Sequence, residues 1–338
     1  SRTMSAKYCI TLKDVQDAQA NIQGLIHTTP IITSSSLNAL AGRKLFFKCE
    51  LLQKTDKCRN SWNKYSLHLG KLCVFYNIRG ALNAVKNLPA NEPVAVVTHS
   101  SGNHGQALAL AAQMRGIPAH VVVPRTAASC KKAAISAYGA QIIECEPNDK
   151  SRTEVAAQTV NDVGGILVHP NQDPAVIAGQ GTIALEVLQQ VPEIEALVVP
   201  VGGGGMLAGI TIAAKAIKPE VKIFAAEPLN ADDCYRSKIN GQLTPNLKPP
   251  TTIADSVKTS IGPNTWPIIR DLVDDVLVIS EEEIKAATRL VWERLKLLIE
   301  PTAGLGLAAV LTTHFQEVAG NIQNIGVVLC GGNIDLAS

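Results

Sequence analysis

The chain has 338 residues, of which 46% are hydrophobic and 18% are charged, as in globular proteins of about two domains. Its formal net charge of +2 argues against a general nucleic-acid binder. No apolar run approaches the ~20 residues that a membrane span needs. We therefore expect neither nucleic acid nor a membrane as a partner.

Cysteine usage points to a reducing compartment. The eight cysteines form no C-x-x-C pair. A chain of this length does not need disulfides to fold, so we expect reduced thiols and a cytoplasmic location.

The first fifty residues show two helical patterns, with a break between them, and one strand. Apolar positions at helical spacing predict a helix from Asp14 to Ile26, which ends before Pro30. Ser34 is a candidate N-cap for a short second helix. An apolar run then predicts a strand over 45–50.

Residues 56–77 differ in composition from the rest of the chain. They hold four aromatic residues, and four basic residues against one acidic residue give a charge of +3. No helical or strand period continues through them, so we interpret them as an inserted surface loop. Single-stranded nucleic-acid binding and a metal site at Cys58, His68 and Cys73 are less favoured alternatives.

From residue 94 onward, short apolar runs alternate with helical patterns. This alternation predicts an α/β fold with mostly parallel sheets that are covered on both faces. Ligands of such sheets bind at the carboxyl ends of strands, and the motifs described below all lie at such ends. The expected strands are 94–98, 120–124, 141–145, 165–169, 196–201, 222–226 and 325–330, and the expected helices include 106–113, 130–137 and 152–160.

Four consecutive glycines, Gly202 to Gly205, follow an apolar strand and precede a helical pattern. Glycine lacks Cβ, so backbone N–H groups can approach an anion closely. The helix N-terminus adds a positive dipole end. The stretch therefore predicts a phosphate site; a flexible linker is the alternative.

A second motif, from Ser100 to His104, also joins a strand to a helix. Free N–H groups at the start of that helix suit a carboxylate, although an ordinary N-cap turn would have the same pattern. Glu227, Asp232 and Asp233 follow another strand and could hold a divalent cation or form a solvated acidic loop.

The glycine stretch also fits a dinucleotide fingerprint. Gly203-x-Gly205-x-x-Ala208 has the required spacing, and Glu227 lies about twenty residues further on. On this alternative the protein would be an NAD-dependent dehydrogenase, with Glu227 binding the ribose.

The motifs taken together resemble the fold type II pyridoxal-phosphate (PLP) enzymes, which have the tryptophan synthase beta-like fold. Within these, the chain is similar to the group of serine racemases and serine/threonine dehydratases. The resemblance rests on the four glycines after Val199-Pro200-Val201 and on Ser100-Ser101-Gly102-Asn103-His104-Gly105. Supporting stretches are 47–51, 168–172, 178–182, 225–228, 230–235 and 300–304.

The resemblance implies two domains and a set of binding residues. The large PLP-binding domain would comprise 4–94 and 166–338, with the inserted loop 56–77, and the small domain 95–165. PLP would be held by Asn103, Gly202, Gly203, Gly204, Gly205, Met206 and Cys330, and the substrate by Ser100, Ser101, Asn103, His104 and Arg152, with Ser101 as the catalytic acid/base. Mg²⁺ (or Ca²⁺ or Mn²⁺) would bind Glu227, Ala231 and Asp233, and ATP, as an allosteric activator in a homodimer, would bind Ser34, Ser35, Lys54, Thr55, Gln106, Lys131, Tyr138 and Asn333.

The chain departs from the family pattern at Asn77, which stands where the family has its Schiff-base lysine. An amide cannot form that bond or serve as the second proton-transfer group. Lys57, Lys64 or Lys71 could replace the missing amine, although productive geometry tolerates little misplacement.

The implied activity is the interconversion of L- and D-serine, with a dehydratase side activity that yields pyruvate and ammonia. Two alternatives stay open: an inactive paralogue or variant that binds PLP or ATP, and the NAD-dependent dehydrogenase.

Overall fold

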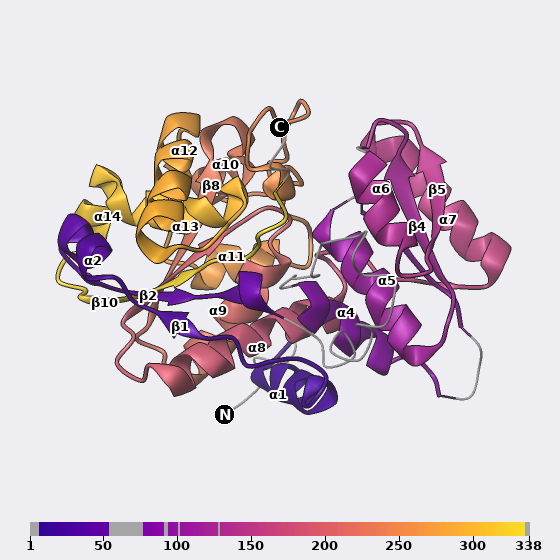
Figure 1. Cartoon of the computed structure of the whole chain (residues 1–338), viewed down its shortest axis with the longest axis horizontal. Coiled ribbons are helices and arrows are strands. Elements are labelled where there is room, and N and C mark those ends of the chain that lie inside the picture. Colours follow the sequence, from indigo (N-terminus) through magenta and orange to yellow (C-terminus); the bar gives the residue numbers. More distant parts are fainter. Residues whose placement is uncertain (1–6, 54–76, 91–93, 101, 128, 335–338) are drawn as a thin grey trace.

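The computed structural model describes residues 7–53, 77–90, 94–100, 102–127 and 129–334. These residues form two lobes, each built around its own sheet (Figure 1). The predicted α/β organisation is therefore present.

The larger lobe contains a six-stranded sheet in the order β1-β2-β10-β7-β8-β9. Only β1 is antiparallel to its neighbour; the other strands pair in parallel. Helices cover both faces (Figure 1). On one side lie α8 (Pro174–Gln190) and α9 (Gly205–Ile217), and on the other lie α12 (Glu281–Leu290) and α13 (Pro301–Leu311). The strands are β1 (Ile31–Ile32), β2 (Lys44–Lys48), β7 (Ala196–Pro200), β8 (Lys222–Pro228), β9 (Asp275–Ile279) and β10 (Asn324–Val328).

Sequence periodicity did not predict two helices of this lobe, α8 and α13, because they are buried on nearly all sides. In α8, for example, most positions from Val176 to Leu188 are buried, so no amphipathic period exists to be read. The helices are α1 (Leu12–Ile22), α2 (Ser35–Ala41), α8 (Pro174–Gln190), α9 (Gly205–Ile217), α10 (Asp233–Asn240), α11 (Trp266–Leu272), α12 (Glu281–Leu290), α13 (Pro301–Leu311) and α14 (Thr313–Val318), with short turns η2 (Glu50–Leu52), η4 (Leu229–Ala231), η5 (Asp255–Val257) and η6 (Val291–Leu295).

The smaller lobe contains a four-stranded parallel sheet in the order β5-β4-β3-β6. Strand β6 pairs with β3 here, so this sheet extends two residues past the expected small-domain boundary at residue 165. The division into two folding domains stays a prediction. The elements are α4 (Asn77–Lys86), β3 (Val96–His99), α5 (Asn103–Arg115), β4 (Ala119–Pro124), α6 (Ser129–Ser136), β5 (Gln141–Cys145), α7 (Asp149–Val163) and β6 (Ile166–Leu167).

Sequence-predicted boundaries differ from the observed ones by a few residues. The first helix begins at Leu12, where Thr11 forms a capping box with Asp14, and ends at Ile22. Ser34 caps α2 as predicted, its side chain accepting from the Leu37 N–H. The strand 141–145 is found with its predicted bounds.

Buried charges tie helix α4 to the larger lobe. Arg79 donates to both carboxylate oxygens of Glu50 at 2.8 Å and to Glu186 at 2.7 and 2.8 Å. Lys48 donates to Glu186 at 2.5 Å. Burial is costly for charges, and this cluster offsets the cost by pairing two cations with two carboxylates. The start of α4 is thereby fixed.

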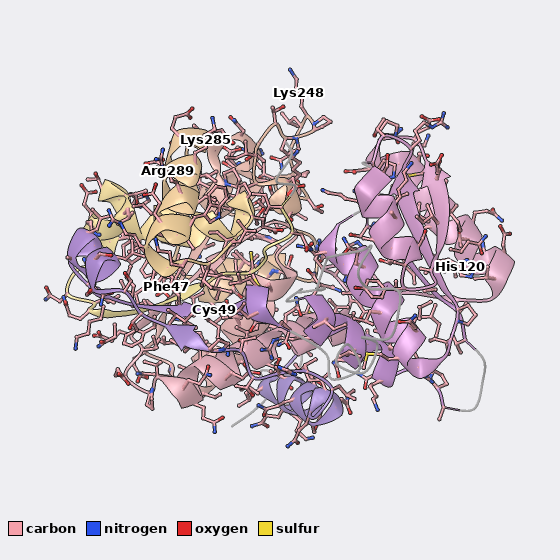
Figure 2. The ribbon with its side chains drawn as sticks, in the orientation of Figure 1. Phe47, Cys49, His120, Lys248, Lys285 and Arg289 are labelled. Carbon is pink, nitrogen blue, oxygen red and sulfur yellow. The ribbon has the colours of Figure 1, made fainter. Side chains whose placement is uncertain are left out.

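Most of the buried residues in the two lobes are hydrophobic. Phe47 and Cys49 lie within the larger lobe, fully buried (Figure 2). In the part of the chain that the structure describes, no helix is long and apolar enough to cross a membrane, and five cysteines are free thiols.

Candidate functional site

A cavity of about 610 Å³ lies between the two lobes. Both predicted motifs line it, the glycine stretch from the larger lobe and the start of α5 from the smaller. The sequence-predicted residues that line it are Asn77, Ser100, Asn103, His104, Lys131, Arg152, Gly202, Gly203, Gly204, Gly205, Met206 and Cys330. Ser101 falls outside the described residues, so its role stays a prediction.

The four glycines form a turn that leaves no room for side chains. Gly204 has φ +86°, a conformation that favours glycine. A Cβ on Gly203 would lie 1.8 Å from the Asn171 amide nitrogen, and one on Gly202 would lie 2.8 Å from the Val257 Cα. Helix α9 begins directly afterwards at Gly205. We call residues 202–205 the glycine cradle; its backbone is packed closely and ends at a helix N-terminus, as an anion site requires.

Polar side chains from other loops hold the cradle in place. Gln172 donates to the Gly203 carbonyl at 3.1 Å, and the Thr265 hydroxyl donates to the same carbonyl at 3.1 Å. Asn171 and Gln172 also line the cavity. Sequence reasoning did not assign roles to Asn171, Gln172 or Thr265, although 168–172 was among the stretches that carried the resemblance.

Asn103, at the start of α5, links the smaller lobe to the larger one. Its side-chain nitrogen lies 3.3 Å from Glu300 Oε1, and its oxygen accepts from Asn333 at 2.8 Å. The Ser256 hydroxyl donates to the same Glu300 oxygen at 3.0 Å. Burial, with a further contribution from the charge of Asp255, raises the pKa of Glu300 to about 7. A half-protonated carboxyl near neutral pH therefore lies behind Asn103.

The smaller lobe contributes both a neutral histidine and charged side chains to the cavity wall. Burial, together with the nearby His169 and His99, lowers the pKa of His104 to about 3, so its imidazole is neutral at pH 7. Arg152 pairs with the exposed Asp149 at 2.5 Å. Its Nε atom is buried and has no hydrogen-bond partner among the residues described here. Arg152 thus brings a positive charge to the cavity lining and has one buried N–H group without a partner among the described residues.

Two further predicted residues lie at the edge of the cavity. Asn77 is the first residue of α4 and is 6% exposed, and its side-chain oxygen has no partner within the described ranges. Cys330 follows β10, and burial raises the pKa of its thiol well above the usual value. The Asn77 amide does not ionise, and the raised pKa keeps the Cys330 thiol protonated, so neither side chain carries a charge at neutral pH.

The predicted metal residues lie outside this cavity lining. Glu227 accepts from the backbone N–H groups of Cys234 and Tyr235 at 3.2 and 2.6 Å. Asp233 accepts from Asn246 and from the Ile261 N–H, both at 2.9 Å. Burial and the nearby Asp233 raise the pKa of Glu227. Because Glu227 is buried and occupied in this way, the structure gives no support to a ribose contact.

The predicted ATP residues are divided between the two ends of the molecule. Ser34 and Ser35 belong to the start of α2, whereas Lys131 belongs to α6, and Figure 1 shows these helices far apart. Lys131 forms an ion pair with Asp255 at 2.5 Å across the cavity. The structure therefore does not bring this set together within one chain. Gln106, Tyr138 and Asn333 lie within the described residues, and Lys54 and Thr55 do not.

Similarity to known proteins identifies the family of this chain. Residues 76–331 match the family model of pyridoxal-phosphate dependent enzymes. Serine racemase from Mus musculus is 62% identical over 339 residues, covering 99% of this chain and 95% of the relative. The chain belongs to the serine racemase family of pyridoxal-phosphate dependent enzymes.

Solved structures agree with this assignment. Maize serine racemase superposes with a TM-score of 0.90 at 41% identity, covering 98% of this chain and 95% of that one. Threonine deaminase from T.th. has a TM-score of 0.86 at 39% identity, covering 97% and 100% of the two chains. The predicted fold type II architecture and the racemase/lyase class of enzyme are confirmed, and neither the dehydrogenase nor the inactive paralogue gains support.

Proposed function

We propose that this chain binds PLP in the cavity between its lobes and acts on serine, as a racemase with a dehydratase side activity. The observation that carries the proposal is the glycine cradle facing the start of α5 across one cavity. The names of the relatives, serine racemase and threonine deaminase, support the same substrate class.

The residues present suit PLP. The crowded glycines and the N-terminus of α9 offer backbone N–H groups to its phosphate. Asn103 would bind the ring hydroxyl, and the neutral thiol of Cys330 would face the ring nitrogen. When bound, PLP stabilises negative charge at the amino-acid Cα. The protein then has to orient the substrate and move one proton.

The substrate would be held by the smaller lobe. Ser100, Asn103 and His104 lie at or next to the first turn of α5, whose free N–H groups favour a carboxylate. Arg152, which also lines the cavity, adds a cation that can pair with the same group. Ser101 would donate or accept the Cα proton from one face.

Asn77 determines how far this chain can carry the reaction. Its amide can accept or donate a hydrogen bond but supplies no amine to carry the cofactor or to move the second proton. We therefore expect the chain to bind PLP without a covalent link at residue 77 and to turn over serine poorly, unless Lys57, Lys64 or Lys71 supplies the amine.

The proposed activity is tested by placing a lysine amine at residue 77. Asn77→Lys, made in the full chain and in a chain with 56–76 shortened, should gain production of D-serine and pyruvate. Asn77→Gln is the matched control, because it adds length without an amine. Borohydride reduction followed by peptide mapping shows which lysine carries PLP. If Asn77→Lys binds PLP yet yields neither product in either length, the proposed activity is wrong.

Three further expectations belong to this proposal. A divalent cation such as Mg²⁺ would bind Glu227, Asp233 and the Ala231 carbonyl, since both carboxylates are buried and this burial, together with the charge of Asp233, raises the pKa of Glu227. ATP would bind between two subunits of a homodimer, since α2 and α6 lie at opposite ends of one chain. The protein would act in the cytoplasm. Calorimetry with Mg²⁺ and with ATP, and sedimentation with and without ATP, test the first two.

A further inference from the structure

The turn after β6 packs directly against the glycine cradle. The Asn171 side chain occupies the space where a Cβ on Gly203 would lie, and Gln172 donates to the Gly203 carbonyl. Gln172 also accepts from the Asn264 N–H at 2.9 Å, and its Nε2 atom lies 3.3 Å from the Thr265 hydroxyl. The position of Gly203 therefore depends on where residues 171 and 172 are held.

One imidazole holds that turn. The Nδ1 atom of His169 accepts from the Asn171 N–H at 3.3 Å and from the Gln172 N–H at 3.1 Å. The side chain thus satisfies two backbone donors that would otherwise lack a partner on the turn. The same pattern, a side-chain acceptor bonded two and three residues onward, is the one that Asn and Asp provide in Asx turns and N-caps.

We propose that His169 is a positioning residue of the glycine cradle: its Nδ1 atom fixes the Asn171–Gln172 turn, and that turn fixes Gly203 for phosphate binding. An imidazole that accepts at Nδ1 and is neutral carries its proton at Nε2. His169 is also one of the residues that line the cavity. This role rests on the proposed function of the cradle as the PLP phosphate site.

The surroundings of His169 keep it neutral. The His99 ring lies edge-on, with 4.8 Å between ring centroids. Burial, followed by the charges of His99 and Arg152, lowers the pKa of His169 to about 4. A protonated ring would place a donor at Nδ1 against two N–H groups, so neutrality is what the turn requires.

Two substitutions separate the acceptor from the ring. His169→Phe keeps an aromatic ring beside His99 but removes the acceptor, whereas His169→Asn removes the ring but retains an acceptor able to form an Asx turn. We expect His169→Phe to bind PLP about tenfold more weakly or worse, since two partly buried backbone N–H groups lose their partner. We expect His169→Asn to remain within about threefold of the unsubstituted chain.

Inorganic phosphate serves as a second probe, because it occupies the cradle without the ring. The affinity of phosphate for the cradle, measured from its competition with PLP, should fall by a similar factor in His169→Phe. Equal PLP affinities in the two variants would overturn the proposal, as would a loss in His169→Asn as large as that in His169→Phe. The melting temperatures of both apo variants identify any global misfolding.

A measurement on the unsubstituted chain keeps the inference testable even if the Phe variant does not fold. Selective ¹⁵N-histidine labelling reports the tautomer of His169, assigned by the loss of its signal in His169→Asn. The Nε2–H tautomer is expected, and an Nδ1–H tautomer or an imidazolium at neutral pH would overturn the proposal. Absence of PLP binding together with the expected tautomer would instead refute only the proposed function.

Discussion

The burial of Glu300 predicts how strongly the free energy of unfolding depends on pH. Its carboxyl is 2% exposed, lies behind Asn103 and has its pKa raised from 4.5 to about 7. The native state therefore holds this proton more tightly than the unfolded chain does. Its contribution to stability is full at low pH and decreases as pH rises from about 4.5 to about 7.

Glu300→Gln should remove this pH dependence, because glutamine resembles the protonated acid and can still accept from Asn103. Raising a pKa from 4.5 to about 7 corresponds to about 3 kcal/mol of unfolding free energy once both states are ionised. The variant should therefore exceed the unsubstituted chain in stability by an amount that grows with pH and reaches about 3 kcal/mol above pH 7.

Urea unfolding of the apo protein at several pH values between about 4 and about 8.5, a range that spans the titration, measures this difference. Glu282→Gln is the control, since that carboxylate is exposed on α12 and its loss removes the same formal charge. Its difference from the unsubstituted chain should stay small at every pH. If Glu300→Gln also follows the unsubstituted chain at a constant offset, the burial argument for Glu300 is refuted.

Three further predictions concern other parts of the molecule. Gly203→Ala should weaken PLP binding and lower the melting temperature, because its Cβ would meet Asn171; an absorbance titration measures the first effect. Arg79→Met should cost about 3–5 kcal/mol in urea unfolding, since it leaves two buried carboxylates without their main partner, whereas Lys13→Met, at an exposed pair, should cost less than about 1 kcal/mol. Mg²⁺ should raise the melting temperature, and Asp233→Asn should abolish that rise; an unchanged response in the variant would exclude Asp233 as a ligand.

The parts of the site that the sequence predicts are those whose residues lie close together along the chain. The glycine cradle and the start of α5 were predictable, because each is a local strand, turn and helix whose residue types reflect their own backbone. Glu300 and Asn103 are 197 residues apart, and no local pattern indicates that they meet. Arg79 and Glu186, 107 residues apart, are a similar case.

The fold shows the same limit. Strand β7 was predictable from its continuous apolar run, whereas α8 was missed because burial on all sides removes the amphipathic signal. The ATP residues show a different limit. The resemblance places Ser34 and Lys131 in one ATP site. Within one chain, however, Ser34 is the N-cap of α2 and Lys131 belongs to α6. A site formed between two subunits cannot be predicted from local patterns in a single sequence.

The ion pair between Glu50 and Arg79 has a consequence for how the chain tolerates insertions. Gln53 is bonded to the His27 backbone at 2.9 and 2.8 Å, and Arg79 follows Asn77 by two residues. The residues on both sides of the stretch 54–76 are thus held by hydrogen bonds and ion pairs whose partners lie outside that stretch. Closing a longer connection between two fixed points costs only about 0.6 kcal/mol for each doubling of length. The bonds on both sides therefore allow the length of this stretch to change at a small cost in free energy while the scaffold around the cavity keeps its contacts.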